Sequence, residues 1–390
     1  MKDMPEIKRI VIIAGEESGD LHAARIVDEL KLNHPQWHFS GIGGRHMENA
    51  GVHLISNLAQ FGVTGISEVL RHFLVIRRAF KDIQAHLKAY KPDLLILVDY
   101  PGFNLRLATF AKKELGIRTL YYISPQIWAW KAGRINTIRD CIDHMAVILP
   151  FEKKLYQDGG VPVSFVGHPL VEHQITEPFH LIDTRKKLGL PENKRLIAML
   201  PGSRLHEIER HMPVLKSSAE LLCQQFSDLH FVIPVAGTID PLLIDAYFKD
   251  SPVPYTLTHG KAIEAVSCCD CAVVASGTAS LECALLEKPM CIIYKASVIT
   301  YMAALKFMKV KYLGLCNLLQ NEMIVPELLQ YDCNPTEMTR MVTSLLETPD
   351  VIERMQTRLA QLKLSLSSHN ADCSILDLIE SEIMHEKSTI

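Results

Sequence analysis

Residues 196–204 read Leu196-Ile-Ala-Met-Leu-Pro-Gly-Ser-Arg204 and predict a buried strand that ends in a tight turn. A second stretch of this kind, Cys271 to Ala275 followed by Ser276-Gly-Thr-Ala-Ser-Leu-Glu282, occurs further along the chain. Each turn opens a segment with helical periodicity, so free backbone N–H groups and the positive end of a helix dipole point the same way. The two strand-turn-helix junctions therefore predict an α/β fold and candidate sites for a diphosphate.

Both turns are rich in small residues, which let a backbone approach an anion closely. Arg204 adds a planar, permanently charged group that can hold two phosphate oxygens. Either junction alone is also consistent with an ordinary helix cap, in which Gly allows the turn and Ser or Thr satisfies free donors. Two such junctions together favour the diphosphate site. The candidate binding residues are Gly202, Ser203, Arg204, Ser276, Gly277, Thr278, Ala279 and Ser280.

Short apolar runs alternate with amphipathic segments throughout the chain. The runs cover residues 9–14, 37–41, 94–99, 118–123, 144–149 and 163–166, and then 196–200, 230–234, 271–275 and 290–294. Nearly continuous apolar runs of this length are expected of parallel strands that are buried on both faces. The pattern predicts two Rossmann-like, doubly wound domains.

The chain has 390 residues, which exceeds a comfortable single core, and the expected joint lies near Gly167-His168-Pro169. We expect an N-terminal domain over residues 1–168 and a C-terminal domain over residues 169–350. Residues 351–390 have helical character and no strand, so they must pack back on the N-terminal domain or on a second subunit. A homodimer is left open.

Composition excludes several classes of protein. The net charge is only -3, so no global basic field indicates a nucleic-acid partner. No secretory signal pattern and no bilayer-length apolar stretch is present, so we expect a cytoplasmic protein. Cys268, Cys269 and Cys271 lack the paired spacing of a zinc site and are better interpreted as core thiols. We expect no metal and no cofactor.

Acidic residues follow two of the predicted strands. The first strand is followed by Gly15-Glu16-Glu17-Ser18-Gly19-Asp20, whose carboxylates would repel a dinucleotide pyrophosphate, and no G-x-G-x-x-G is present. Asp99 ends another apolar run, where partial burial would raise its pKa toward the range of a general base. The alternative is that Asp99 caps the following helix or accepts hydrogen bonds in the turn.

Several segments combine apolar and basic residues. Trp128 and Trp130 lie near Lys131 and Arg134, where they could stack on a sugar, contact a lipid headgroup or simply pack in a helix. Residues 65–90 and 301–312 form apolar stripes flanked by Lys and Arg. Such helices can lie in an anionic membrane surface, although a helix that covers a sheet has the same stripe. Two of them favour an interfacial surface.

A series of short blocks stands out along the chain: Ala14-Gly-Glu-x-Ser-Gly-Asp20, Gly41-x-Gly-Gly44, Asp99-x-Pro-x-Phe-Asn104, Tyr122-Ile-Ser-Pro-Gln-Ile-Trp-Ala-Trp130, Leu149-Pro-Phe-Glu152, Gly167-His168, Leu200-Pro-Gly-Ser-Arg204 with Glu207, Ala275-Ser-Gly-Thr-Ala-Ser-Leu-Glu282 and Asn317-Leu-Leu319. In these blocks, their order and their spacing, the chain resembles the lipid-A-disaccharide synthases from about residue 8 to residue 375. So many blocks make the resemblance specific.

The resemblance implies a glycosyltransferase-B fold, in which two Rossmann-like domains face a cleft and the C-terminal domain holds the nucleotide. It implies transfer of 2,3-diacylglucosamine from UDP to the 6-hydroxyl of 2,3-diacylglucosamine 1-phosphate (lipid X). The products would be the β-1,6-linked lipid A disaccharide 1-phosphate and UDP. The resemblance also implies that the protein binds peripherally to the inner face of the inner membrane of a Gram-negative cell.

The resemblance and the charges together suggest roles for individual residues. Asp99 is the first candidate for the general base and Glu16 is the second. With no D-x-D pair to chelate a divalent ion, Arg204 and the two helix starts would neutralise the leaving diphosphate. Glu282 would accept a ribose hydroxyl, and Asn317 would contact uracil or diphosphate. The resemblance adds Gly15, Ser18 and Glu207 to the substrate-binding residues.

The chain departs from the family pattern at Asn321-Glu322, where relatives commonly carry a Gly-Arg pair, so Arg204 would bear more of the diphosphate charge. Other functions share the same cradle for a diphosphate. Another UDP-sugar glycosyltransferase or an epimerase of this fold would have no use for basic-apolar helices. A nucleotide-binding regulator would have no use for Glu16 and Asp99.

Overall fold

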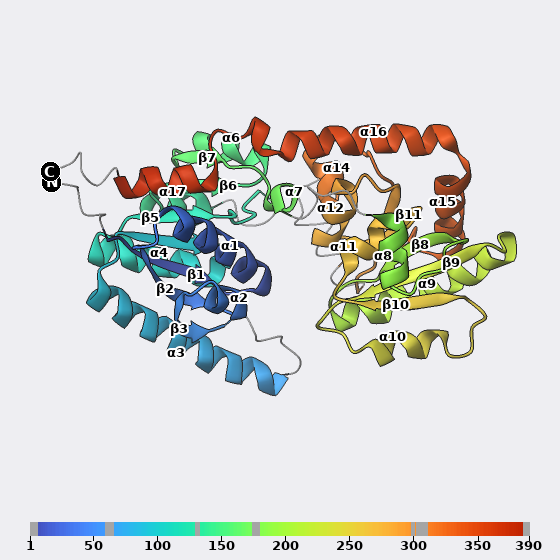
Figure 1. Ribbon diagram of the computed structural model, residues 1–390, viewed down its shortest axis with the longest axis horizontal. Coiled ribbons are helices and arrows are strands. Elements are labelled where there is room, and N and C mark those ends of the chain that lie inside the picture. The colour runs from blue at the N-terminus through green and yellow to red at the C-terminus, as the bar shows by residue number, and fades with distance from the viewer. Residues whose placement is uncertain are drawn as a thin grey trace. The chain divides into compact units, whose positions relative to one another are not determined.

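The computed structural model describes residues 7–58, 66–128, 133–173, 180–297, 301 and 311–384, with only the backbone at 66–73 and 173. The chain divides into two compact units (Figure 1). The first unit comprises Met1–Pro169 and Leu366–Ile390, and the second comprises Leu170–Ser365.

The first unit is built on a seven-stranded sheet with the order β3-β2-β1-β4-β5-β6-β7, and every pair in it is parallel. Its strands are β1 Arg9–Ala14, β2 His38–Gly43, β3 His53–Asn57, β4 Leu94–Val98, β5 Thr119–Tyr122, β6 His144–Val147 and β7 Val163–Phe165. Its helices are α1 Glu17–Asn33, α2 Arg45–Asn49, α3 Ile66–Tyr90, α4 Pro101–Leu115, α5 Arg134–Cys141, α6 Pro150–Asp158 and α17 Ile375–Met384. α7 Pro169–His173 begins at the last residue of the unit's first segment.

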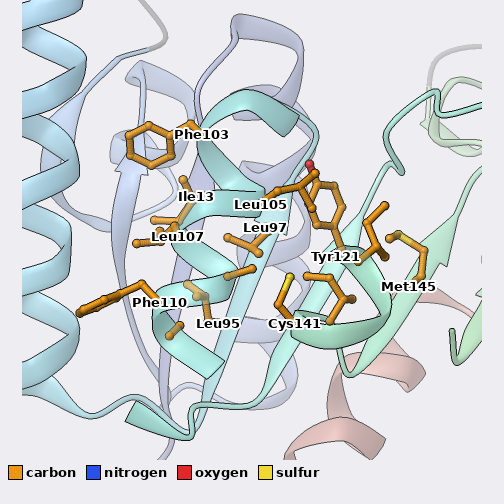
Figure 2. Close-up of a cluster of buried hydrophobic side chains, with 14 of the residues drawn as sticks. Ile13, Leu95, Leu97, Phe103, Leu105, Leu107, Phe110, Tyr121, Cys141 and Met145 are labelled. Carbon is orange, nitrogen blue, oxygen red and sulfur yellow. The ribbon is translucent and has the colours of Figure 1, made fainter. Parts of the chain in front are cut away.

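Both faces of this sheet are buried. Leu95 and Leu97 of β4 point to one face, where Figure 2 shows them in one cluster with Leu107 and Phe110 of α4. The alternate residues of β4 belong to a second apolar cluster on the opposite face, which also includes residues of α1 and α17. Alternation along buried strands thus places helices on both faces, which is the doubly wound arrangement.

The second unit is built on a six-stranded parallel sheet with the order β10-β9-β8-β11-β12-β13. Its strands are β8 Arg195–Leu200, β9 Leu229–Val235, β10 Tyr255–His259, β11 Cys271–Ala275, β12 Met290–Tyr294 and β13 Glu327–Leu329. Its helices are α8 Leu181–Lys187, α9 Leu205–Gln225, α10 Pro241–Phe248, α11 Ala262–Ser267, α12 Thr278–Leu285, α14 Leu315–Gln320, α15 Pro335–Glu347 and α16 Pro349–Leu366. The two sheets confirm the predicted fold class.

The C-terminal tail is divided between the units, whereas we expected residues 351–390 to form one segment. Helix α16 lies mostly in the second unit, where Leu359 and Leu362 are fully buried. Helix α17 lies in the first unit, because Ile379 and Ile383 complete an apolar cluster of that unit. Each helix therefore packs on a different unit, because each buries its own apolar face there.

The two segments that combine apolar and basic residues, 65–90 and 301–312, differ in how much of them the structure describes. From Val75 onward, α3 buries Ala79, Ile83 and Leu87 in the core and leaves Arg77, Arg78 and Lys81 exposed, so this part of the helix covers the sheet. The stretch 301–312 lies outside the described residues apart from 301, 311 and 312. In the described part of the chain, no helix has the length and apolar character to span a membrane.

Candidate active site

Asp99 lies at the carboxyl end of β4, next to the loop that follows β1, because β1 and β4 are paired. The backbones of Asp99 and Tyr100 are left-handed, with φ of 45° and 49°, which is uncommon for residues other than glycine. The Asp99 carbonyl accepts hydrogen bonds from Tyr121 Oη at 2.6 Å and Asn104 Nδ2 at 2.7 Å. These bonds fix the backbone at Asp99 in a strained turn and hold its carboxyl group at the end of the sheet.

Burial and the nearby Glu16 carboxylate raise the pKa of Asp99 to about 6, although the Tyr100 N–H partly offsets them. Asp99 is therefore mostly ionised at neutral pH and is a stronger base than an exposed aspartate. The capping alternative is not supported, because Tyr100 is the N-cap residue of α4 and that helix start has no side-chain cap. The side chain of Asp99 can accept a proton from a substrate hydroxyl.

The loop after β1 places Gly15 against Tyr100 and Glu16 near Asp99, and Ser18 follows in the first turn of α1. A Cβ atom on Gly15 would lie 2.3 Å from Tyr100 Cδ1, so only glycine lets the Tyr100 ring pack against this loop. Glu16 is the N-cap residue of α1 without a side-chain cap bond, and both Glu16 and Ser18 are exposed. Asp20 has a structural role, since it accepts hydrogen bonds from the N–H groups of Gly44, His46 and Met47.

The first junction of the second unit follows β8 and is organised by Glu207. The Glu207 carboxylate accepts hydrogen bonds from Ser203 N at 3.0 Å and Arg204 N at 3.2 Å, and Arg204 Nη1 donates to it at 3.0 Å. A Cβ atom on Gly202, whose φ is 122°, would lie 2.4 Å from Glu207 Oε2. The amides that we expected to be free are thus engaged by Glu207, whereas the Arg204 side chain is 70% exposed.

The second junction follows β11 and has an open helix start. Gly277 is the N-cap residue of α12, and among the described residues no side chain accepts a hydrogen bond from the amides of Thr278 and Ala279. Ser276 Oγ donates to the Leu313 carbonyl at 3.1 Å, and the buried Ser280 Oγ donates to the Gly277 carbonyl at 2.7 Å. The two serines therefore shape the turn, and Gly277 and Thr278 are exposed at a helix start whose geometry suits an anion.

Glu282 and Asn317 lie in different environments. Burial raises the pKa of Glu282, whose side chain lines a small hollow with Leu200, Ala262, Ile263, Val266, Cys283 and Leu286. Asn317 is fully buried; its Nδ2 donates to Val325 O and Glu327 Oε1, both at 2.8 Å, and its Oδ1 accepts from Val325 N at 2.9 Å. The Glu282 residue thus borders this hollow, and the Asn317 amide group is hydrogen-bonded within the fold.

Two residues with a clear role in these loops were missed by the sequence analysis. The buried His211 has its Nδ1 2.7 Å from the Pro201 carbonyl, and its Nε2 accepts from Lys295 N at 3.0 Å. These two partners require a neutral ring, and they tie the first junction to the end of β12. Glu152 is buried beside the loop that follows β5. Only the Leu149-Pro-Phe-Glu152 block pointed to Glu152, and nothing in the sequence singled out His211.

Among the described residues, no three His, Cys, Asp or Glu side chains are grouped as a metal site would require. Cys268, Cys269 and Cys271 are buried free thiols, and burial raises the pKa of each. Thiols of this kind are poor nucleophiles and poor ligands, so they are core residues.

The fold is shared with solved glycosyltransferases and epimerases. The chain resembles the calicheamicin glycosyltransferase CalG4 with a TM-score of 0.60 at 12% identity, covering 97% of this chain and 98% of that one. It resembles the UDP-GlcNAc 2-epimerase from Neisseria meningitidis, solved with UDP-GlcNAc bound, with a TM-score of 0.60 at 13% identity, covering 89% of this chain and 94% of that one. Glycosyltransferases and epimerases share this fold, so the fold alone does not separate the two functions.

Comparison with known sequences distinguishes a glycosyltransferase from an epimerase. The family model of the lipid-A-disaccharide synthetases matches residues 10–379. A lipid-A-disaccharide synthase 1 from Legionella pneumophila (strain Lens) is 57% identical over 380 residues, which is 97% of this chain and 99% of the relative. The enzyme of that name from Trichlorobacter lovleyi is 40% identical over 379 residues, which is 96% of this chain and 98% of the relative. The chain belongs to the lipid-A-disaccharide synthetase family and is a glycosyltransferase. The comparisons support this function and not the epimerase alternative.

Proposed function

We propose that the chain transfers 2,3-diacylglucosamine from UDP-2,3-diacylglucosamine to the 6-hydroxyl of lipid X, giving the β-1,6-linked disaccharide 1-phosphate and UDP. The observation that carries the proposal is Asp99, an acid with a pKa raised to about 6 at the carboxyl end of β4. An attacking sugar hydroxyl needs such a base, because its own pKa is far above neutral. Family membership supplies the substrates.

The reaction is a displacement with inversion. Asp99 accepts the proton of the 6-hydroxyl while the oxygen attacks the anomeric carbon of the donor. The bond from that carbon to the β-phosphate oxygen breaks, and its electron pair leaves with UDP. Asp99 is held in place through its own backbone by Tyr121 and Asn104, so the carboxyl group keeps its position as it changes charge. Glu16, which is exposed, raises the basicity of Asp99 through its charge.

The leaving diphosphate gains negative charge in the transition state. In our proposal the amides of Thr278 and Ala279 and the guanidinium of Arg204 stabilise that charge, and Glu282 accepts a ribose hydroxyl. A charge-assisted hydrogen bond contributes about 1.5–3 kcal/mol. Donors aimed at developing charge lower the barrier more than they tighten substrate binding.

The location and assembly belong to the same proposal. We place the protein on the cytoplasmic face of the inner membrane as a peripheral protein, because both substrates carry acyl chains. Arg77, Arg78 and Lys81, exposed on α3, give the first unit basic side chains that would attract anionic lipid. The proposal includes a homodimer as the assembly. It includes no nucleic-acid partner.

The test supplies UDP-2,3-diacylglucosamine and lipid X and identifies the product by mass and anomeric configuration. An epimerase would instead return an isomerised nucleotide sugar without consuming lipid X, and that result would refute the proposal. Asp99→Ala should lower kcat by about a hundredfold or more, since general-base catalysis contributes about 10²–10⁴-fold. UDP affinity should stay nearly unchanged. Asp140→Ala, at an exposed position of α5, is the matched control and should keep the wild-type rate.

A further inference from the structure

Glu152 lies at the start of α6, which follows β6, and its residue is 1% exposed. Its Oε1 accepts a hydrogen bond from Trp128 Nε1 at 3.0 Å. The Trp128 ring also packs edge-on against Phe151, with ring centroids 5.3 Å apart. Because β5 and β6 are paired, Glu152 faces the loop of residues 123–128 that follows β5.

This loop is strained and is held from α6 at two points. Ile123 begins the loop with φ of 61°, which is a genuine outlier for a β-branched residue. Tyr156, one helical turn after Glu152 on α6, donates from Oη to the Pro125 carbonyl at 3.0 Å. A strained backbone persists only where surrounding contacts determine it. Glu152 and Tyr156 supply such contacts at Trp128 and Pro125.

One side of the Glu152 carboxyl group lacks a partner. Within the described residues, the buried Oε2 of Glu152 and the buried Oγ of Ser124 make no hydrogen bond. Ser124 is nevertheless close enough to Glu152 to lower the pKa of that carboxyl group. A protonated carboxyl group or a buried water would satisfy both atoms at once.

Charged and titratable groups surround Glu152 on several elements. Asp99 faces it from the end of β4, and Tyr156 faces it from α6. Tyr121 of β5 interacts electrostatically with Asp99, with Tyr156 and with Arg134 of α5, while Glu16 acts on Asp99. Burial raises the pKa of Glu152 to about 7, and Trp128 and Ser124 partly offset this rise. Two neighbouring carboxyl groups of this kind resist ionising together.

We propose that Glu152 is a positioning residue for the transfer: as a neutral carboxylic acid it holds Trp128 and donates its proton toward Ser124, and so fixes the loop of residues 123–128 beside Asp99. The proposal rests on Asp99 acting as the base. Glu152 is too deeply buried to contact the substrate itself. Its ionisation would add a second negative charge near Asp99 and reverse the contact with Ser124, whose hydroxyl would then donate to the carboxylate, and this would change the geometry of the loop.

The kinetic test compares Glu152→Gln with Glu152→Ala. We expect the wild-type kcat to decline at alkaline pH, as Glu152 ionises. The amide keeps an oxygen for Trp128 and a donor for Ser124 and cannot ionise, so Glu152→Gln should keep kcat within about threefold of wild type at pH 6.5 and should not show this decline. Glu152→Ala should lower kcat more than tenfold at every pH, with UDP affinity unchanged. Glu114→Gln, at an exposed position of α4, should leave the wild-type pH profile intact. An unchanged alkaline decline in Glu152→Gln, or a wild-type kcat in Glu152→Ala, would overturn the proposal.

A second measurement does not depend on activity. The ¹⁵N–¹H resonance of the Trp128 indole, assigned with Trp128→Phe, should titrate in the wild type with a midpoint near the pKa of Glu152, about 7. The titration should be absent in Glu152→Gln. An indole resonance that does not move would refute the role of Glu152 even if the disaccharide is made. A wild-type protein that makes no disaccharide would instead refute the proposed function.

Discussion

Replacing Glu382 of α17 should destabilise the first unit strongly. Glu382 is 3% exposed, and its two oxygens accept from Arg118 Nε at 2.7 Å and His144 Nδ1 at 3.1 Å. The ring of His144 also contacts Ser164 Oγ at 2.9 Å, which orients it. These contacts join the C-terminal helix to β5, β6 and β7, so Glu382→Ala removes the polar anchor of α17.

The magnitude follows from the number and burial of the bonds. Two charge-assisted hydrogen bonds of about 1.5–3 kcal/mol each would sum to about 3–6 kcal/mol. The Arg118 side chain is 31% exposed, so water screens part of the interaction and we expect the lower end of this range. We therefore predict a loss of about 3 kcal/mol in the free energy of unfolding of the first unit.

The assay uses intrinsic fluorescence in urea. The three tryptophans, Trp37, Trp128 and Trp130, all belong to the first unit, so their emission reports the unfolding of that unit. With an m-value of about 2 kcal/mol/M, Glu382→Ala should lower the urea midpoint by about 1.5 M. Asp82→Ala removes an exposed pair with Arg78 on α3 and should change the free energy by less than about 0.5 kcal/mol.

The effect should depend on pH in a definite direction. Burial alone would raise the pKa of Glu382, but the hydrogen bonds from His144 and Arg118 outweigh it and leave the pKa below its ordinary value. The stabilisation is therefore complete above the pKa of an unfolded glutamate and is lost as the pH falls through the lower pKa of the folded state. The difference between Glu382→Ala and wild type should shrink on acidification. A variant within about 0.5 kcal/mol of wild type at pH 7, or a difference that persists in acid, would refute this reasoning.

Two further predictions concern ligand and membrane binding. Arg204→Ala should weaken UDP binding about tenfold in calorimetry, which is the lower end for a charge-assisted contact because the Arg204 side chain is exposed. Arg340→Ala, at another exposed position of the second unit, is the control. If Arg204→Ala bound UDP as tightly as the wild type, Arg204 would not belong to the diphosphate site. The protein should sediment with anionic vesicles at low salt, and changing Arg77, Arg78 and Lys81 to Glu should reduce this retention, since each basic residue near the surface contributes about 1 kcal/mol. Wild-type protein that stays in the supernatant at low ionic strength would contradict the membrane proposal.

The sequence predicts the interior of each sheet and misses most of its edges. The runs predicted as strands include β4, in which all five residues are buried, and β11, which is equally buried. The strands that were missed are β3, β10 and β13, and each lies at the edge of its sheet. Their residues are mostly half-buried and partly polar, so no continuous apolar run marks them. Edge strands form because a neighbouring strand offers hydrogen bonds, and that neighbour cannot be identified from local sequence.

The same limit applies to the site. Asp99 was predicted because an acid that ends an apolar run is visible in the sequence itself. Asn317 was given a ligand contact, but its amide is used by Val325 and Glu327, which pair with it only in the folded unit. His211 was missed because its partner Lys295 is distant in sequence. Residues that act directly at strand ends are thus easier to predict than residues that hold the loops in place.

The two junctions have similar sequences, but the structure gives them different tasks. At the first junction the Glu207 carboxylate occupies the amides of Ser203 and Arg204, and its charge would oppose a second anion there. At the second junction the helix start at Thr278 has no side-chain cap. Strands β8 and β11 are hydrogen-bonded neighbours, so the two loops lie side by side. We therefore expect the diphosphate to be centred on the second junction, while the exposed guanidinium of Arg204 reaches it from the first.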